Sequence, residues 1–351
     1  MEKLLVLTHV DEFGAALTAA SLEAVAAGVE FASALGATLA IGIVGAHTAA
    51  NNDAAANSVA GAASQILTVS GEAFAQARYA SDAAACEALC RAAQATLVFA
   101  PASSRFARVV PGVAYRLSGF ADTHITALAK SATQSATLEA TRWFYRQRVE
   151  AVVRRDTRPW FLLLEAGTRE PWVPTASAGY VQAEAVPVAL PPLRTNVTGI
   201  SAPRQDEQTI RPEAKILFVA GAGWTKKQAD GQVHGVEAEK LILGFLHSTD
   251  ASLGSSKSLV DQSGESQEVL KFMTHLNQIG QTGATPRHAK GLSTCCHGEE
   301  PHVVGWRFIN ERRAINLDAN CGWTRGKADV VYIADAFKVM AKVNALLSEQ
   351  K

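Results

Sequence analysis

Short apolar runs alternate with helical segments along the first half of the chain. Continuous runs of apolar residues at 4–7, 38–44, 65–69 and 96–100 predict buried strands. Alanine-rich segments at 17–35 and 83–92 predict helices between them, and Gly36 is well placed to end the first helix. Because buried strands that alternate with helices are typical of a parallel sheet covered on both faces, we expect an α/β fold. Residues 104–117 predict a further helix, unless Pro111 marks its first turn.

The pattern changes after residue 140. The segment 141–146 mixes aromatic residues with arginines and leads to an apolar run at 149–153. A second run at 160–164 follows a turn at 156–159, so we expect paired strands joined by that turn. A further apolar segment lies at 185–190. The side chains of 141–146 either contact a partner subunit or form an exposed strand face.

A polar, proline-containing segment at 199–212 separates the two halves of the chain and predicts a linker. The second half begins with an apolar run at 215–220, continues with a helical segment at 236–245, and ends with a strand at 330–333 and a helix at 337–347. The chain has 351 residues, enough for two domains with full hydrophobic cores. We therefore predict two α/β domains, each a mainly parallel sheet flanked by helices. The first is a Rossmann-like domain at 1–198, and the second spans 213–351.

Composition narrows the functional classes. The chain is 48% hydrophobic and 19% charged, with a formal net charge of +0, so its charge gives no support for binding to nucleic acid. No apolar run reaches the length needed to span a bilayer, and the first residues lack the features of a signal peptide. A cytoplasmic protein is therefore expected.

Five cysteines in a chain of this length do not indicate a disulfide framework. Cys86 and Cys90 are four residues apart on a predicted helix and should face the core. A second group of cysteines and histidines lies near the C-terminus: Cys295, Cys296, His297, His302 and Cys321. Adjacent cysteines do not match the Cys-x-x-Cys spacing of tetrahedral zinc sites, so we expect no metal there. They would instead pack at the end of a buried strand.

A Gly-x-Gly pattern follows the apolar run at 215–220. Gly221 and Gly223 could form a turn that binds phosphate at a helix N-terminus. The third glycine of the dinucleotide fingerprint is missing, which argues against a nicotinamide-dependent dehydrogenase. The alternative is a tight turn that requires small residues.

The second half also carries a series of short motifs in a fixed order. They are Gly254-Ser255-Ser256-Lys257, Gly280-Gln281-Thr282-Gly283, Ala314-Ile315-Asn316, Ala328-Asp329 and Phe337-Lys338. This series resembles the α subunit of the electron-transfer flavoproteins, which carries Gly-Ala-Ser-Arg, Gly-Gln-Thr-Gly, Ala-Ile-Asn and Ala-Asp segments in the same order. The resemblance covers nearly the whole chain, and the second domain makes it specific.

The resemblance implies that the second domain binds FAD. Thr282 matches a threonine whose hydroxyl approaches flavin N5, and Gln281 and Gly283 line the same turn. Ser256 and Lys257 match a serine–arginine pair whose arginine lies beside the isoalloxazine ring. A cation at that edge would favour an anionic reduced flavin.

The other implied FAD contacts come from later segments. His302 matches a histidine near the flavin C2 carbonyl, and Asn316 and Asp329 match residues near the adenosine end. A loop that reads Gly-Ile-Ser-Gly-Ala in the family is altered here: Gly298 keeps its second glycine, and His297 would donate a hydrogen bond where serine did. Glu299 and Glu300 follow this loop near the expected pyrophosphate.

The implied function is that of an electron carrier without a catalytic nucleophile or general base. The chain would pair with a β subunit, which could itself bind AMP. It would accept electrons from a flavin-dependent dehydrogenase and pass them to a quinone oxidoreductase or a similar acceptor. The alternative is a flavin-free nucleotide-binding or scaffold subunit with the same fold.

Overall fold

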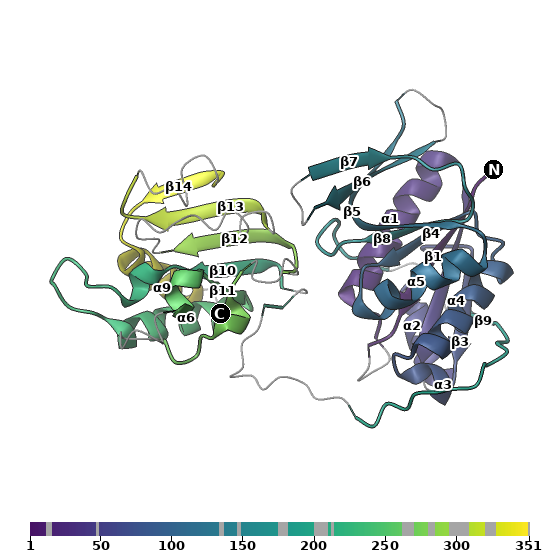
Figure 1. Cartoon of the computed structure of the whole chain (residues 1–351), viewed down its shortest axis with the longest axis horizontal. Coiled ribbons are helices and arrows are strands. Elements are labelled where there is room, and N and C mark those ends of the chain that lie inside the picture. Colours follow the sequence, from purple (N-terminus) through teal and green to yellow (C-terminus); the bar gives the residue numbers. More distant parts are fainter. Residues whose placement is uncertain are drawn as a thin grey trace. The chain divides into compact units, whose positions relative to one another are not determined.

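The computed structural model shows an α/β chain that divides into two compact units, Met1–Ile200 (unit 1) and Ser201–Lys351 (unit 2) (Figure 1). The structure describes residues 1–11, 16–46, 49–132, 137–145, 149–174, 182–199, 210–211, 214–261, 270–279, 285–294, 309–319 and 328–349. Each unit contains its own sheet, and the predicted fold class is confirmed. Most of the segment expected to be the linker lies outside the described residues. Within the described part of the chain, no helix is long and apolar enough to cross a membrane.

Unit 1 is built on a nine-stranded sheet with the order β7-β6-β5-β8-β4-β1-β2-β3-β9. The strands are β1 (Lys3–His9), β2 (Thr38–Ala46), β3 (Gln65–Ser70), β4 (Leu97–Pro101), β5 (Phe120–Lys130), β6 (Leu138–Phe144), β7 (Val149–Val153), β8 (Trp160–Leu164) and β9 (Glu184–Ala185). In the part of the sheet with the order β5-β8-β4-β1-β2-β3-β9, every pair of neighbouring strands is parallel. Strand β6 runs antiparallel to both of its neighbours, β5 and β7. The sheet is therefore mainly parallel, with an antiparallel extension at one edge.

Helices cover both faces of this sheet (Figure 1). Helices α1 (Ala19–Leu35) and α2 (Ala49–Asn57) pack on one face, and α3 (Glu72–Ala75), α4 (Tyr79–Ala92) and α5 (Ser104–Arg116) pack on the other. Gly36 ends α1 as predicted, because it adopts φ 63°, a left-handed conformation that a residue with a Cβ avoids. Cys86 and Cys90 are buried in the core on α4, also as predicted.

Helix α5 begins at Ser104 and continues through Pro111, so the alternative start at Pro111 is wrong. The Ser103 hydroxyl accepts the amide of Phe106 and caps the first turn. Pro111 lies on the exposed side of the helix. Water can reach the carbonyl that loses its partner there, which explains why the helix tolerates an interior proline.

The expected pairing of 149–153 with 160–164 is wrong. Strand β7 pairs with β6 at the edge of the sheet, whereas β8 lies in the middle, between β4 and β5. All five residues of β8 are buried, and a strand that is apolar throughout must be covered on both faces. Residues of β7 are partly or fully exposed, which an edge strand allows.

Asp122 on β5 holds the antiparallel extension to the centre of the sheet. It is fully buried, and its carboxylate accepts hydrogen bonds from Arg142 on β6 at 2.6 Å, from Arg155 at 2.9 and 3.1 Å, and from the Trp160 indole on β8 at 2.9 Å. Burial alone would raise the pKa of Asp122, but the hydrogen bonds from Arg155, Trp160 and Arg142 outweigh it and hold the pKa below its ordinary value. One carboxylate therefore joins three parts of unit 1.

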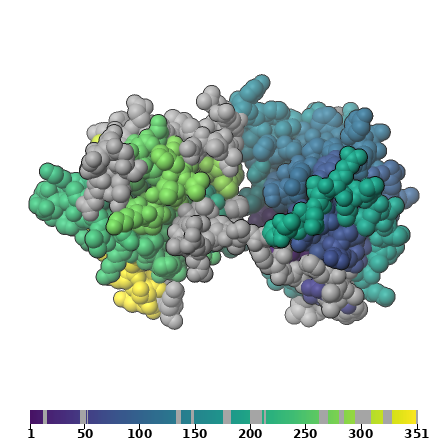
Figure 2. Space-filling model, turned by 60° about the horizontal axis from the view of Figure 1, so that its bottom comes forward, coloured from purple at the N-terminus to yellow at the C-terminus, as the bar shows by residue number. Residues whose placement is uncertain are grey.

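Of the apolar segment expected at 185–190, only Ala185 lies in a strand, the two-residue β9. The amide of Val186 donates to the Thr68 carbonyl at 2.9 Å, and Val186 and Val188 pack against the core beneath them. Figure 2 shows this part of the chain as a teal strip over the blue atoms of unit 1. The segment therefore closes the second edge of the sheet.

Unit 2 is built on a five-stranded parallel sheet with the order β11-β10-β12-β13-β14. Its strands are β10 (Ile216–Ala220), β11 (Ser252–Ser255), β12 (His288–Thr294), β13 (Ile309–Asn316) and β14 (Val330–Ile333). Helices α6 (Gly235–Thr249) and α9 (Ala336–Glu349) pack on one face of the sheet, as the sequence predicts for their positions. On the other face, Ile279 packs against Leu217 and Val219.

Arg211 fixes the start of unit 2 to the amino edge of this sheet. Its amide donates to the Ser252 hydroxyl at 2.7 Å, and its guanidinium lies 3.0 Å from the Asp250 carboxylate. The ring nitrogen Nε2 of His288 lies 2.8 Å from the Arg211 carbonyl oxygen. Ser252 and His288 are the first residues of β11 and β12, so Arg211 lies at the amino ends of these strands.

Candidate functional site

The strand order of unit 2 marks one edge of its sheet as a candidate ligand site. From β10 the chain proceeds to β11 on one side, and then returns to β12 on the other side and continues outward. In open parallel sheets, ligands bind outside the carboxyl ends of the strands at such a switch point. The candidate site is therefore the edge formed by the last residues of these strands, here called the carboxyl edge: Ala220, Ser255, Thr294, Asn316 and Ile333.

A buried turn after β10 is hydrogen-bonded to the end of β12 at the switch point. Residues Ala222–Thr225 form the 3-10 helix η1, which is buried. The amide of Gly221 donates to the Thr294 carbonyl at 2.9 Å, and the Trp224 indole donates to the Thr294 hydroxyl at 2.8 Å. Trp224 packs on Phe337 with 4.6 Å between ring centroids. Gly221 thus belongs to a packed turn with its amide already used, which agrees with the tight-turn interpretation of the Gly-x-Gly pattern.

Ser256 and Lys257 follow directly at the end of β11. The amide of Ser256 donates to the Ala220 carbonyl at 2.9 Å, and its hydroxyl accepts the amide of Leu259 at 3.2 Å. That bond caps the short helix α7 (Lys257–Asp261). The side chain of Lys257 is 54% exposed, and its ammonium lies 3.7 Å from the Asp261 carboxylate. Its charge is therefore available at the carboxyl edge.

Ser255, the last residue of β11, has a different environment. It is 1% exposed, and its hydroxyl oxygen has no hydrogen-bond partner among the described residues. Its backbone carbonyl accepts a hydrogen bond from the amide of Ile279 at 3.1 Å. A buried hydroxyl without a partner is uncommon in folded proteins and requires an explanation.

Ile279 brings the chain across the end of β11 immediately before the Gly280-Gln281-Thr282-Gly283 segment. A Cβ on Gly254 would lie 2.6 Å from the Ile279 side chain, so glycine at 254 permits this close contact. Six predicted site residues lie outside the described residues: Gln281, Thr282, Gly283, His297, Gly298 and His302. Cys295, Cys296 and Cys321 also lie outside them.

Asn316 and Asp329 lie at opposite edges of the sheet. Asn316 ends β13 at the carboxyl edge, is 2% exposed, and donates from its amide to the Asp318 carbonyl at 3.0 Å. Asp329 precedes β14 at the amino edge, where its carboxylate accepts the Arg312 amide at 2.6 Å. The structure thus brings Ser256, Lys257 and Asn316 to one edge and does not bring Asp329 there.

Asp335 is a carboxyl-edge residue that sequence reasoning missed. It follows β14, and its carboxylate accepts the Phe337 amide at 2.9 Å at the start of α9. The signal was present, because the Ala-Asp pair at 328–329 occurs again at 334–335. Only the strand bounds show which of the two pairs lies at the carboxyl edge.

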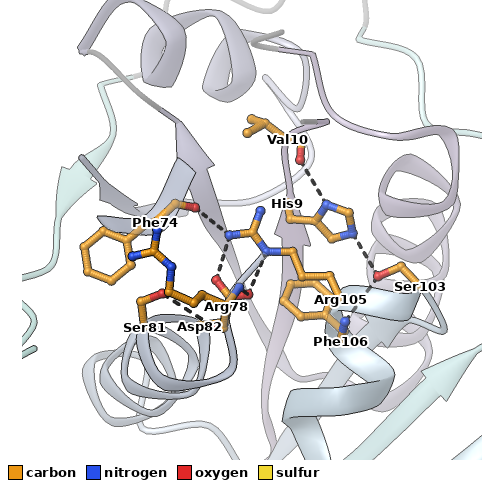
Figure 3. Close-up of polar contacts among 9 residues, drawn as sticks. All are labelled: His9, Val10, Phe74, Arg78, Ser81, Asp82, Ser103, Arg105 and Phe106. Atoms are coloured by element: carbon orange, nitrogen blue, oxygen red, sulfur yellow. Dashed lines mark hydrogen bonds and ion pairs between the residues drawn. The ribbon is translucent and has the colours of Figure 1, made fainter. Parts of the chain in front are cut away.

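Unit 1 contains a buried polar cluster at the carboxyl end of β1 (Figure 3). The His9 ring contacts the Val10 carbonyl through Nδ1 at 3.0 Å and the Ser103 hydroxyl through Nε2 at 2.8 Å. Because a carbonyl only accepts, Nδ1 carries the proton and Nε2 accepts from Ser103. Burial lowers the pKa of His9, and the positive charge of Arg105 acts in the same direction. The histidine is therefore held neutral as part of the core.

Arg105 and Asp82 complete this cluster. Their side chains are 3% and 0% exposed, and the guanidinium donates to the carboxylate at 3.0 Å from Nε and at 2.6 Å from Nη2. Asp82 also accepts the Arg78 amide at 3.0 Å. The pair ties the start of α5 to the start of α4. Sequence analysis assigned no role to His9 and did not single out Asp82 or Arg105, because the His9–Ser103 and Asp82–Arg105 contacts join residues 94 and 23 positions apart.

Comparison with known proteins identifies unit 1. Residues 6–191 match the family model described as the electron transfer flavoprotein domain. A search of curated proteins finds no match to the chain. In the described part of unit 2, no three His, Cys, Asp or Glu side chains are grouped so that they could hold a metal ion.

Proposed function

Because the chain belongs to the electron transfer flavoprotein family, we propose that it is an α subunit that carries electrons on FAD bound in unit 2. The observation that carries this proposal is the second parallel sheet, which lies beyond the matched residues 6–191. Its carboxyl edge has the switch point of a ligand-binding α/β sheet. The segment that resembles one α-subunit motif, Gly254–Lys257, lies at that edge, and Ile279, the residue before the second motif, donates its amide to the Ser255 carbonyl there.

The residues present at the carboxyl edge fit FAD. The buried Ser255 hydroxyl lacks a partner within the described residues, and Lys257 supplies an exposed positive charge two residues later. The turn at Gly221–Thr225 is buried and hydrogen-bonded to Thr294 at the same edge. Bound FAD would supply reversible acceptance and release of electrons, with no substrate bond made or broken by the protein.

The chain's own residues would bind and orient the flavin. We propose that Lys257 stabilises the negative charge of the reduced ring, with Ser256 beside it, and that Asn316 lies near the adenosine end of FAD. Thr282, with Gln281 and Gly283, would face flavin N5. The remaining proposed contacts are His297, Gly298 and His302. Asp329 is left out of the proposed site because it pairs with Arg312 at the opposite edge, and Asp335 is the better-placed carboxylate.

The proposed partner is an electron-transfer flavoprotein β subunit, which would complete a heterodimer. A flavin-dependent dehydrogenase would donate the electrons, and a quinone oxidoreductase or a similar protein would accept them. The test is co-expression with the β subunit and purification of the pair. We expect one FAD per heterodimer, released on denaturation. A colourless complex that takes up no added FAD would instead support a flavin-free scaffold subunit.

Replacing Lys257 by glutamine tests the proposed charge effect. A half-exposed cation near the flavin ring contributes about 1 kcal/mol to binding of the reduced form, so Lys257→Gln should lower the first reduction potential by roughly 40 mV. Spectroelectrochemical titration of the purified heterodimer measures this value. Lys240→Gln, at an exposed position of α6, is the matched control and should leave the potential unchanged. Equal potentials for wild type and Lys257→Gln would show that Lys257 does not act on the flavin.

A further inference from the structure

Ser255 differs from the other buried polar residues at or next to the carboxyl ends of strands in unit 2. The Thr294 hydroxyl accepts from Trp224 and donates to the Val219 carbonyl at 3.2 Å, and the Asn316 amide donates to Asp318. The Ser256 hydroxyl caps α7 through Leu259. Of these four side chains, Ser255 alone has no hydrogen bond, although it is as buried as its neighbours.

Ser255 lies at the carboxyl edge, next to described residues that are assigned to the cofactor. Ser255 is paired in register with Ala220, the last residue of β10, and Gln278 forms a bridge to it from the chain that leads into Gly280. Ser256 and Lys257 follow it directly. Ser255 is thus set between the end of β10 and Gln278, two residues before Gly280.

Serine is an unfavourable choice at this position in the absence of a ligand. Burying a hydroxyl without a hydrogen bond destabilises the folded state, whereas alanine would fill nearly the same space without that cost. The motif that this segment resembles has alanine here, as Gly-Ala-Ser-Arg, so the hydroxyl is a feature of this chain. A ligand that pairs with the hydroxyl would offset its burial.

We propose that the Ser255 hydroxyl is a cofactor-binding group that forms a hydrogen bond with a polar atom of the FAD bound at the carboxyl edge. This inference rests on the proposed function. It adds to the site a contact that compensates for the use of the Ser256 hydroxyl as a helix cap. Of the two adjacent serines, Ser256 thus caps α7 and Ser255 binds the cofactor.

The test compares Ser255→Ala with wild type in the full-length heterodimer stripped of flavin. Two quantities are measured: the melting temperature without FAD, and the dissociation constant for added FAD by quenching of flavin fluorescence. We expect the melting temperature of Ser255→Ala to be unchanged or higher, because no protein hydrogen bond is lost. The dissociation constant should rise about fivefold to tenfold, the value of one hydrogen bond.

Two further variants complete the experiment. Ser255→Thr keeps the hydroxyl and should bind FAD more tightly than Ser255→Ala, and Ser258→Ala on α7 should bind as wild type does. Equal dissociation constants for wild type and Ser255→Ala would overturn the inference and leave the proposed function standing. A lower melting temperature for flavin-free Ser255→Ala would also overturn it, by showing a partner within the protein. If wild type binds no FAD, the proposed function and the inference both fail.

Discussion

Replacing Asp82 by alanine is expected to destabilise unit 1 by about 3–5 kcal/mol, because the substitution leaves the Arg105 guanidinium buried without its counter-charge. Both side chains are almost completely excluded from water, and two hydrogen bonds join them. The substitution also removes the acceptor for the Arg78 amide at the start of α4. Urea unfolding of the intact chain measures the loss, and amide hydrogen exchange assigns it to unit 1.

Two variants separate the charge effect from a general disruption of the helices. The double variant Asp82→Asn with Arg105→Met removes both charges and keeps an acceptor for Arg78, so it should recover about half or more of the lost stability. Glu87→Gln breaks more exposed pairs with Arg91 on the same helix and with Arg116 on α5, and should cost less than about 1 kcal/mol. If Asp82→Ala costs no more than Glu87→Gln, the buried pair is not the anchor of α4 and α5 described above.

Replacing Asp122 by asparagine is the second substitution expected to have a large effect, at about 3–5 kcal/mol. Asparagine has a similar shape but no charge, and it can no longer accept from Arg142, Arg155 and Trp160 at the same time. The loss should concentrate in the antiparallel extension formed by β5, β6 and β7. Relative to wild type, the variant should show a larger increase in amide hydrogen exchange in these strands than in β1 and β2.

The pH dependence gives an independent test of Asp122. Its pKa is lowered in the folded protein, so its contribution to stability is present above the unfolded pKa of about 3.9 and is lost as pH falls through the lower native pKa. Wild type should therefore lose more stability than Asp122→Asn between pH 5 and pH 3. Glu139→Gln, in a partly exposed pair with Arg154, should leave the wild-type pH profile nearly unchanged. Parallel profiles for wild type and Asp122→Asn would contradict the assigned role.

The parts of the fold that could be predicted from sequence are strands that are apolar along most of their length and helices with a clear end signal. Strands β1 to β4 are mostly apolar and buried, and α1 has a clear end at Gly36, so each was predicted close to its observed bounds. Strand β13 was missed, because it contains polar and charged residues such as Arg313. Strand β8 was predicted as a strand, but its place in the sheet depends on long-range pairing that local pattern does not determine.

The candidate site could be predicted only in part, for related reasons. The order of the motifs indicated which segments to consider, and the strand bounds then put Ser256, Lys257 and Asn316 at one edge. Sequence gave no reason to prefer Asp335 over Asp329, since both follow alanine. Neither could it identify the Ser255 hydroxyl, because the lack of a partner is a property of packing and not of residue type.

The attachment of Arg211 has a structural consequence for unit 2. Arg211 is bonded to Ser252 and His288 at the amino ends of β11 and β12, whereas the candidate site lies at the carboxyl ends. A five-residue strand such as β10 is roughly 16 Å long, and that length separates the Arg211 attachment from the proposed site. The attachment and the proposed cofactor site therefore use opposite ends of the same strands.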